Sequence, residues 1–105
     1  MRASFSHILD DLYRIILDRK TANPTTSRTA RLFAKGPKKI AQKVGEEAVE
    51  VALEGEKGSL DDLAGESADL IYHLLVLWAS RGLAPETVWA RLKERRISSS
   101  NDKEK

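Results

Sequence analysis

The sequence predicts an all-α domain, and three observations lead to that expectation. Apolar side chains recur at helical spacing along most of the chain, whereas the strict alternation of apolar and polar residues typical of strands is absent. The six glycines and three prolines fall mostly between these periodic segments, where they can end helices. At 105 residues the chain suits one domain and is too short for two. We therefore expect a small bundle of about four helices.

The first helix is expected to run to about residue 19, and either Ser4 or Ser6 can cap its start. A loop rich in turn-forming residues follows at 21–27. A short helical stretch is then expected over 29–35, because a glycine follows it directly.

The next helix is the first of two long ones. Pro37 suits its first turn, and the helix is expected to end near Glu54, before two glycines. Ser59 followed by Asp62 resembles a capping box and predicts the start of the second long helix. That helix is expected to stop at Gly82.

The last helix is expected to open at Pro85, which can occupy a first helical turn. From residue 97 onward the chain is almost entirely polar, and we expect a disordered tail. The predicted organisation is therefore one domain over 1–96 and a tail over 97–105.

The second long helix is apolar almost all round between residues 70 and 78. Such a helix must be covered on every side, and a domain of this size buries proportionately little surface. We therefore expect the bundle to be completed by homodimerisation.

Composition excludes several classes of protein. The net charge is only +2, which argues against a strongly basic nucleic-acid coat protein. No cysteine is present, so disulfides and thiolate metal sites are excluded. The first residues lack the apolar core of a signal peptide, and the longest apolar run, 74–79, is far too short to span a bilayer. We expect a cytoplasmic protein that binds neither membranes nor nucleic acid.

Two carboxylates interrupt the apolar stripes of the long helices. At about 100° per residue, Glu47 falls inside the stripe of its helix, and Glu66 does the same on the next. A carboxylate aimed at a core costs several kcal/mol unless a cation or a proton compensates it. The apolar neighbours on the two helical wheels are Ile40, Val44 and Val51 for Glu47, and Leu63, Leu70 and Leu77 for Glu66.

The register of the two long helices would bring four acids together. In an antiparallel hairpin centred on Gly58, Glu47 faces Asp69 and Glu50 faces Glu66. These oxygen ligands suit a hard divalent cation, and Mg²⁺ in particular keeps positions open for water and phosphate. The alternative is that the acids are solvated helix faces, which is the usual explanation for a single pair.

Glu46 points away from the stripe, so it could be a surface acid, a support for the site, or a base for water. A set of cations comes just before the acids, and lysine or arginine next to a metal site suits phosphate. A run of lysines is otherwise most often a solvated face. The set comprises Arg28, Arg31, Lys35, Lys38, Lys39 and Lys43.

The segments 43–50 and 66–69 read KVGEEAVE and ESAD, and their EExxE…ExxD pattern resembles the all-α MazG-like nucleoside triphosphate pyrophosphohydrolases. Over about 9–92 the chain more specifically resembles the phosphoribosyl-ATP pyrophosphohydrolase family of histidine biosynthesis. One departure is Arg28, where that family leads us to expect an aromatic residue. The segments that carry the closer resemblance are 9–13, 29–32, 35–37, 39–43 and 68–77.

This resemblance implies a MazG-like fold and Mg²⁺-dependent hydrolysis of phosphoribosyl-ATP to phosphoribosyl-AMP and pyrophosphate. It also implies that Glu46 positions or deprotonates the attacking water, with Glu47 beside it in catalysis. The residues implied to contact substrate are Arg31, Lys35, Lys39 and Lys43, and those implied to hold the metal are Glu47, Glu50, Glu66 and Asp69.

Two other functions remain open. A house-cleaning pyrophosphatase acting on noncanonical nucleotides would need the same acids with different base contacts. A helical interaction module without enzymatic activity would need no acids in its apolar stripes. Metal-dependent pyrophosphate release would distinguish the module from both enzymes, and substrate preference would distinguish the enzymes from each other.

Overall fold

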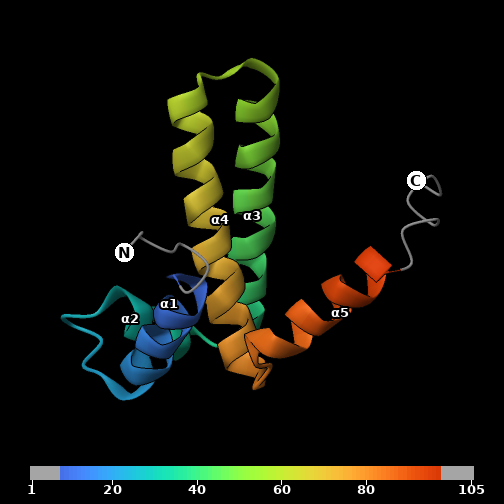
Figure 1. Ribbon diagram of the computed structural model, residues 1–105. Coiled ribbons are helices and arrows are strands. Elements are labelled where there is room, and N and C mark those ends of the chain that lie inside the picture. Colours follow the sequence, from blue (N-terminus) through green and yellow to red (C-terminus); the bar gives the residue numbers. More distant parts are fainter. Residues whose placement is uncertain (1–7, 98–105) are drawn as a thin grey trace, which may run out of the picture.

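The computed structural model describes residues 8–97, which fold into five α-helices and one short 3-10 helix (Figure 1). The described residues contain no strand, so the predicted all-α class is confirmed. The capping serines predicted for the first helix, and the tail from residue 98 onward, lie outside the described residues, and Ile97 ends the last helix. The elements are α1 (Ile8–Asp18), η2 (Arg19–Thr21), α2 (Arg28–Lys35), α3 (Pro37–Lys57), α4 (Leu60–Arg81) and α5 (Pro85–Ile97).

The two longest helices, α3 and α4, form an antiparallel hairpin and lie side by side along its length (Figure 1). The predicted end of α3 near Glu54 is wrong by about one turn, because the helix continues to Lys57. A glycine inside a helix costs roughly 1 kcal/mol relative to alanine, and packing against a partner helix can offset that cost. At Gly55 the two helices come close, since an added Cβ would lie 3.9 Å from Leu63 Cδ1.

Side-chain caps fix the starts of α2 and α4. Ser27 Oγ accepts a hydrogen bond from the Ala30 backbone N at 3.1 Å, so α2 begins one residue earlier than predicted. Ser59 Oγ accepts from the Asp62 backbone N at 3.0 Å, which confirms the predicted start of α4. Gly82 ends α4 with a φ of 73°, a left-handed conformation that favours glycine.

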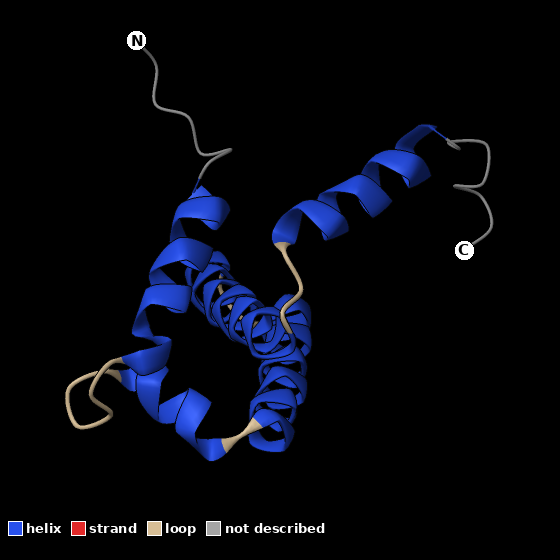
Figure 2. Cartoon of the chain, turned by 90° about the horizontal axis from the view of Figure 1, so that it is seen from below, coloured by secondary structure: helices blue, strands red, loops and turns tan. Residues whose placement is uncertain are grey.

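The core lies at the end of the hairpin opposite its turn, where α1 and α2 pack against α3 and α4. In Figure 2 the hairpin is seen end-on, with the N-terminal helices to one side and α5 directed away on the other. Nothing among the described residues covers the half of the hairpin near its turn, where Leu53 is 55% exposed and Leu60 84% exposed. The core consists of Ile16, Leu32, Ile40, Leu75, Val76 and Ala79.

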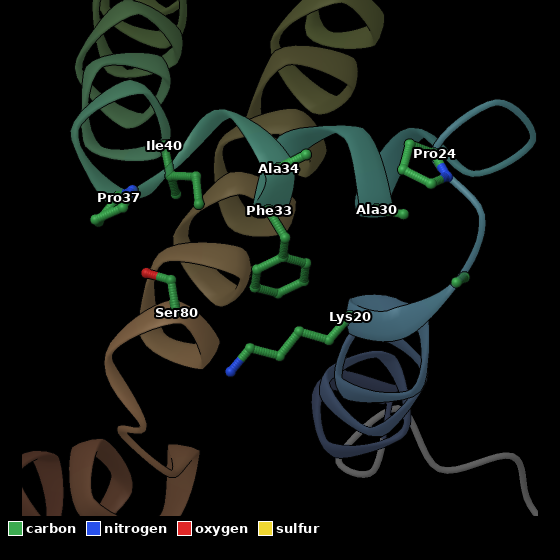
Figure 3. A pocket seen from close by; sticks show the side chains of 9 residues that line it. Lys20, Pro24, Ala30, Phe33, Ala34, Pro37, Ile40 and Ser80 are labelled. Carbon is green, nitrogen blue, oxygen red and sulfur yellow. The ribbon is translucent and has the colours of Figure 1, made fainter.

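A lysine ties the 3-10 helix to the end of α4 (Figure 3). Lys20 Nζ donates a hydrogen bond to the Ala79 carbonyl at 3.3 Å and lies 5.6 Å from the centre of the Phe33 ring. A cation next to the last carbonyls of a helix is favourable, because it complements the helix dipole. The cavity around this lysine has a volume of about 360 Å³ and is lined mainly by apolar residues. The Lys20 ammonium group in it already donates a hydrogen bond to the Ala79 carbonyl.

The last helix, α5, projects away from the hairpin and contacts the other helices near its start (Figure 1). Trp89 packs edge-on against Trp78 with ring centres 5.9 Å apart, and its indole N donates to Asp10 Oδ1 at 3.4 Å. Farther along α5, Leu92 is 55% exposed. Among residues 8–97, no helix is both long and apolar enough to cross a membrane.

Candidate active site

Three carboxylates meet across the α3–α4 hairpin. Glu47 of α3 and Glu66 and Asp69 of α4 each offer an oxygen, and these oxygens all lie within 4.8 Å of one another. Glu66 and Asp69 lie three residues apart on α4 and therefore share one face of that helix. Glu47 and Glu66 are partly buried and Asp69 is exposed, so the cluster opens to solvent on one side.

The neighbouring acids disturb the ionisation of Glu66. The pKa of Glu66 is raised from its ordinary value, first by loss of solvation and then by repulsion from Glu47, Glu50 and Asp69. A hydrogen bond with Glu47 favours the protonated form further. Negative charge on these neighbouring acids therefore disfavours ionisation of Glu66.

Glu50, the fourth predicted metal ligand, lies outside the group of three. It is exposed on α3, one turn beyond Glu47, yet close enough to raise the pKa of Glu66. The predicted set of four is therefore a cluster of three oxygen donors with a fourth carboxylate beside it.

A strongly cationic pocket lies next to the acid cluster, between α2 and α3, with α4 contributing to its lining. Its volume is about 450 Å³, within the range of small-molecule sites. All four residues predicted to contact substrate line it, whereas Lys38 does not. The lining residues are Arg28, Arg31, Leu32, Lys35, Lys39, Lys43, Glu46 and His73.

Helical spacing explains this convergence. Arg28, Arg31 and Lys35 recur at three and four residues on α2, so they share one face. Lys39 and Lys43 do the same on α3, and the tight connection at Gly36 turns the two faces toward a common space. Arg31 is held further by a hydrogen bond that its Nη1 donates to the Pro24 carbonyl at 2.8 Å.

Glu46 lines the pocket and directly precedes Glu47 of the acid cluster in the sequence. Its carboxylate accepts a hydrogen bond from Gln42 Nε2 at 2.9 Å and lies 3.4 Å from Lys43 Nζ. These partners, Gln42 foremost and then Lys43 and Lys39, lower the pKa of Glu46. A carboxylate with a lowered pKa is a weak proton acceptor, so this environment suits holding a water by hydrogen bonding better than deprotonating it.

His73 is 1% exposed beneath the pocket. Its Nδ1 lies 2.8 Å from the Asp69 carbonyl, which can only accept, so Nδ1 carries the proton and donates. Nε2 has no hydrogen-bond partner among the described residues. The ring therefore connects the pocket wall to the backbone of one of the clustered acids.

Sequence reasoning did not find the contacts of Arg28. Its guanidinium lies 5.3 Å from the centre of the Tyr72 ring, and the Tyr72 hydroxyl is 2.6 Å from the Thr29 hydroxyl. The spacing of Arg28 from Arg31 and Lys35 was a usable signal for its place in the pocket. No pattern in the sequence indicates its pairing with an aromatic residue of α4.

The donor set fits a hard divalent cation. All three grouped ligand atoms are carboxylate oxygens, which Mg²⁺ prefers, and their mutual repulsion is what a bound cation would relieve. Among the described residues no histidine joins the group, which argues against a site for softer metals.

Comparisons with known proteins identify the family of the chain. A family model described as phosphoribosyl-ATP pyrophosphohydrolase matches residues 9–96. The phosphoribosyl-ATP pyrophosphatase of Azospirillum brasilense is 54% identical over 92 residues, which is 88% of this chain and 83% of that protein. The protein of the same name from Paramagnetospirillum magneticum is 52% identical over 98% of this chain and 94% of its own length. The chain therefore belongs to the phosphoribosyl-ATP pyrophosphohydrolase family.

Proposed function

We propose that this protein hydrolyses phosphoribosyl-ATP to phosphoribosyl-AMP and pyrophosphate, a step of histidine biosynthesis. The observation that carries the proposal is a three-carboxylate cluster linked to a pocket with five cationic side chains by His73, which lines the pocket and hydrogen-bonds to the Asp69 carbonyl. Family membership supports the choice of substrate, since relatives about half identical to this chain are named phosphoribosyl-ATP pyrophosphatase.

Mg²⁺ is the proposed cofactor, held by Glu47, Glu66 and Asp69, with Glu50 as the further candidate ligand. When bound, it would supply positive charge that neutralises the phosphate oxygens and the charge developing on the departing pyrophosphate.

The chain's own residues would then bind and orient the substrate. Lys43 lies one turn before Glu47 on α3 and Lys39 lies two turns before it, so their ammonium groups suit the phosphates nearest the acid cluster. Arg31 and Lys35 extend the cationic wall along α2. Glu46, kept ionised by its partners, would accept a hydrogen bond from the attacking water and fix its orientation.

The direct test measures pyrophosphate release from phosphoribosyl-ATP with Mg²⁺ and with a chelator. We expect turnover with Mg²⁺ and a fall to background with the chelator, because the clustered carboxylates then have no cation to share with the phosphates. A parallel panel of nucleoside triphosphates serves as the control. Equal or faster turnover of a noncanonical nucleotide would favour a house-cleaning pyrophosphatase, and no turnover of any nucleotide would reject the enzymatic function.

We also propose that the functional unit is a homodimer. The structure leaves large apolar side chains exposed on the hairpin, including Val49 at 58%, Leu53 at 55% and Ile71 at 41%. A second copy packed against the hairpin would bury these apolar side chains, which a chain of this size cannot cover by itself.

Light scattering at micromolar concentration should therefore give about twice the 11.7 kDa mass of the chain. Changing Leu53 to Glu places a charge in the proposed interface and should shift the mass toward the monomer. The same change at Ala84, an exposed position in the loop before α5, is the control and should leave the mass unchanged. A wild-type mass of one chain would reject the homodimer.

A further inference from the structure

Arg28 lies on α2 and is one of the cations that line the pocket. Among the described residues, no carboxylate forms an ion pair with it, although it lines the pocket beside Glu46. Its guanidinium instead lies 5.3 Å from the centre of the Tyr72 ring. A guanidinium placed over an aromatic ring keeps N–H groups that point away from the ring, and these can bind an anion bidentately.

The aromatic partner of Arg28 is itself held on several sides. The Tyr72 hydroxyl is 2.6 Å from the Thr29 hydroxyl, and its ring meets His73 edge-on with centres 5.0 Å apart. His73 in turn donates to the carbonyl of Asp69, one of the clustered acids. The Tyr72 ring against which the exposed Arg28 guanidinium lies is therefore held at a fixed place relative to the acid cluster.

The substrate of the proposed reaction carries two separate anionic groups. One is the triphosphate, and the other is the phosphate of the ribosyl group attached to the base. ATP has the first group and lacks the second. A cation that binds only the second phosphate therefore strengthens the binding of phosphoribosyl-ATP without strengthening that of ATP, which makes the site selective.

The positions of the cations divide these tasks. Lys39 and Lys43 lie on α3, the helix that carries Glu47, and are suited to the triphosphate at the acid cluster. Arg28 lies on a different helix, α2, and its guanidinium lies over Tyr72 of α4, one turn after Asp69. Resting on the proposed function, we infer that the Arg28–Tyr72 pair binds the phosphate of the base-linked ribosyl group and so distinguishes phosphoribosyl-ATP from ATP.

The experiment compares KM and kcat for phosphoribosyl-ATP with the inhibition constant of ATP as a competing ligand. Arg28→Gln should raise KM for phosphoribosyl-ATP by roughly 10- to 100-fold, the range for loss of a charge-assisted hydrogen bond. The inhibition constant of ATP and kcat at saturation should stay within about twofold, because the triphosphate contacts are untouched.

Two further variants separate charge from stacking. Arg28→Lys keeps the charge without the planar edge and should raise KM by less than Arg28→Gln does. Tyr72→Leu removes the ring beneath the guanidinium and should also raise KM while sparing the inhibition constant of ATP. Arg95→Gln changes an exposed arginine of α5 outside the pocket and is the matched control, with no expected effect.

The outcomes separate this inference from the proposed function. If Arg28→Gln weakens ATP and phosphoribosyl-ATP by the same factor, Arg28 binds the triphosphate and the inference is wrong. An unchanged KM in an active enzyme overturns the inference alone. Absence of turnover of phosphoribosyl-ATP by the wild type rejects the proposed function, and the inference with it.

Discussion

Replacing Glu66 with glutamine should reduce pyrophosphate release from phosphoribosyl-ATP by roughly 100- to 1,000-fold. Glu66 is one of three carboxylates whose oxygens lie within 4.8 Å of one another, and the amide keeps the shape while removing one charge from the cluster. Charge stabilisation by a catalytic metal is worth several kcal/mol, and each 1.36 kcal/mol corresponds to a factor of ten in rate.

The same substitution should leave the metal-free protein at least as stable as the wild type. The pKa of Glu66 is raised in the folded state, chiefly by loss of solvation and then by its neighbouring acids. The folded state therefore binds a proton more readily than the unfolded state does, and the wild type loses stability as the pH rises through the raised pKa. In chelator at neutral pH, Glu66→Gln should melt at a higher temperature than the wild type, and near pH 4 the difference should vanish.

Two other acids complete this experiment. Glu54→Gln changes a partly buried carboxylate on α3 beyond the cluster, so it should alter neither pyrophosphate release nor the response to Mg²⁺. Glu50→Gln tests the fourth carboxylate, and a loss of rate comparable to that of Glu66→Gln would place it among the ligands. Hydrolysis by Glu66→Gln at the wild-type rate would show that the carboxylate cluster is not the active site.

Most of the fold could be predicted because its boundaries are set by local chemistry. Ser27 and Ser59 cap their helices with hydrogen bonds that span three residues, and Gly82 adopts the left-handed conformation that ends α4. The end of α3 could not be predicted in the same way. Two glycines suggested a stop near Glu54, but packing of α3 against α4 carries the helix through Gly55 to Lys57.

In the candidate site, too, local patterns could be predicted and helix packing could not. Glu47, Glu66 and Asp69 could be brought together from sequence, because helical spacing and one hairpin register determine which residues face each other. The place of Arg28 depends on how α2 packs across α4 and on the rotamer that stacks its guanidinium on Tyr72. Neither a helical wheel nor a register contains that information, since both describe one helix or one pair of neighbours.

The core at the base of the hairpin should be the most sensitive part of the fold. Leu75 is 1% exposed on α4, and Leu75→Ala should cost about 2–5 kcal/mol through lost burial and the cavity left behind. Because the whole core comprises few fully buried side chains, and domains of this kind are stable by only about 5–15 kcal/mol, this loss is a large share of the total. Thermal unfolding should show a melting temperature at least about 10 °C lower.

Ile71→Ala is the matched control, because Ile71 lies one turn before Leu75 on the same helix and is 41% exposed. In a single copy of the chain this substitution should lower the free energy of unfolding by less than about 1 kcal/mol, because a half-exposed side chain loses little burial. If a second copy covers this face, the cost of Ile71→Ala should grow as protein concentration rises, because dimerisation then contributes to stability. The cost of Leu75→Ala within the core should change far less with concentration. Equal losses for the two variants at every concentration would show that the core does not lie where α1 and α2 meet the hairpin.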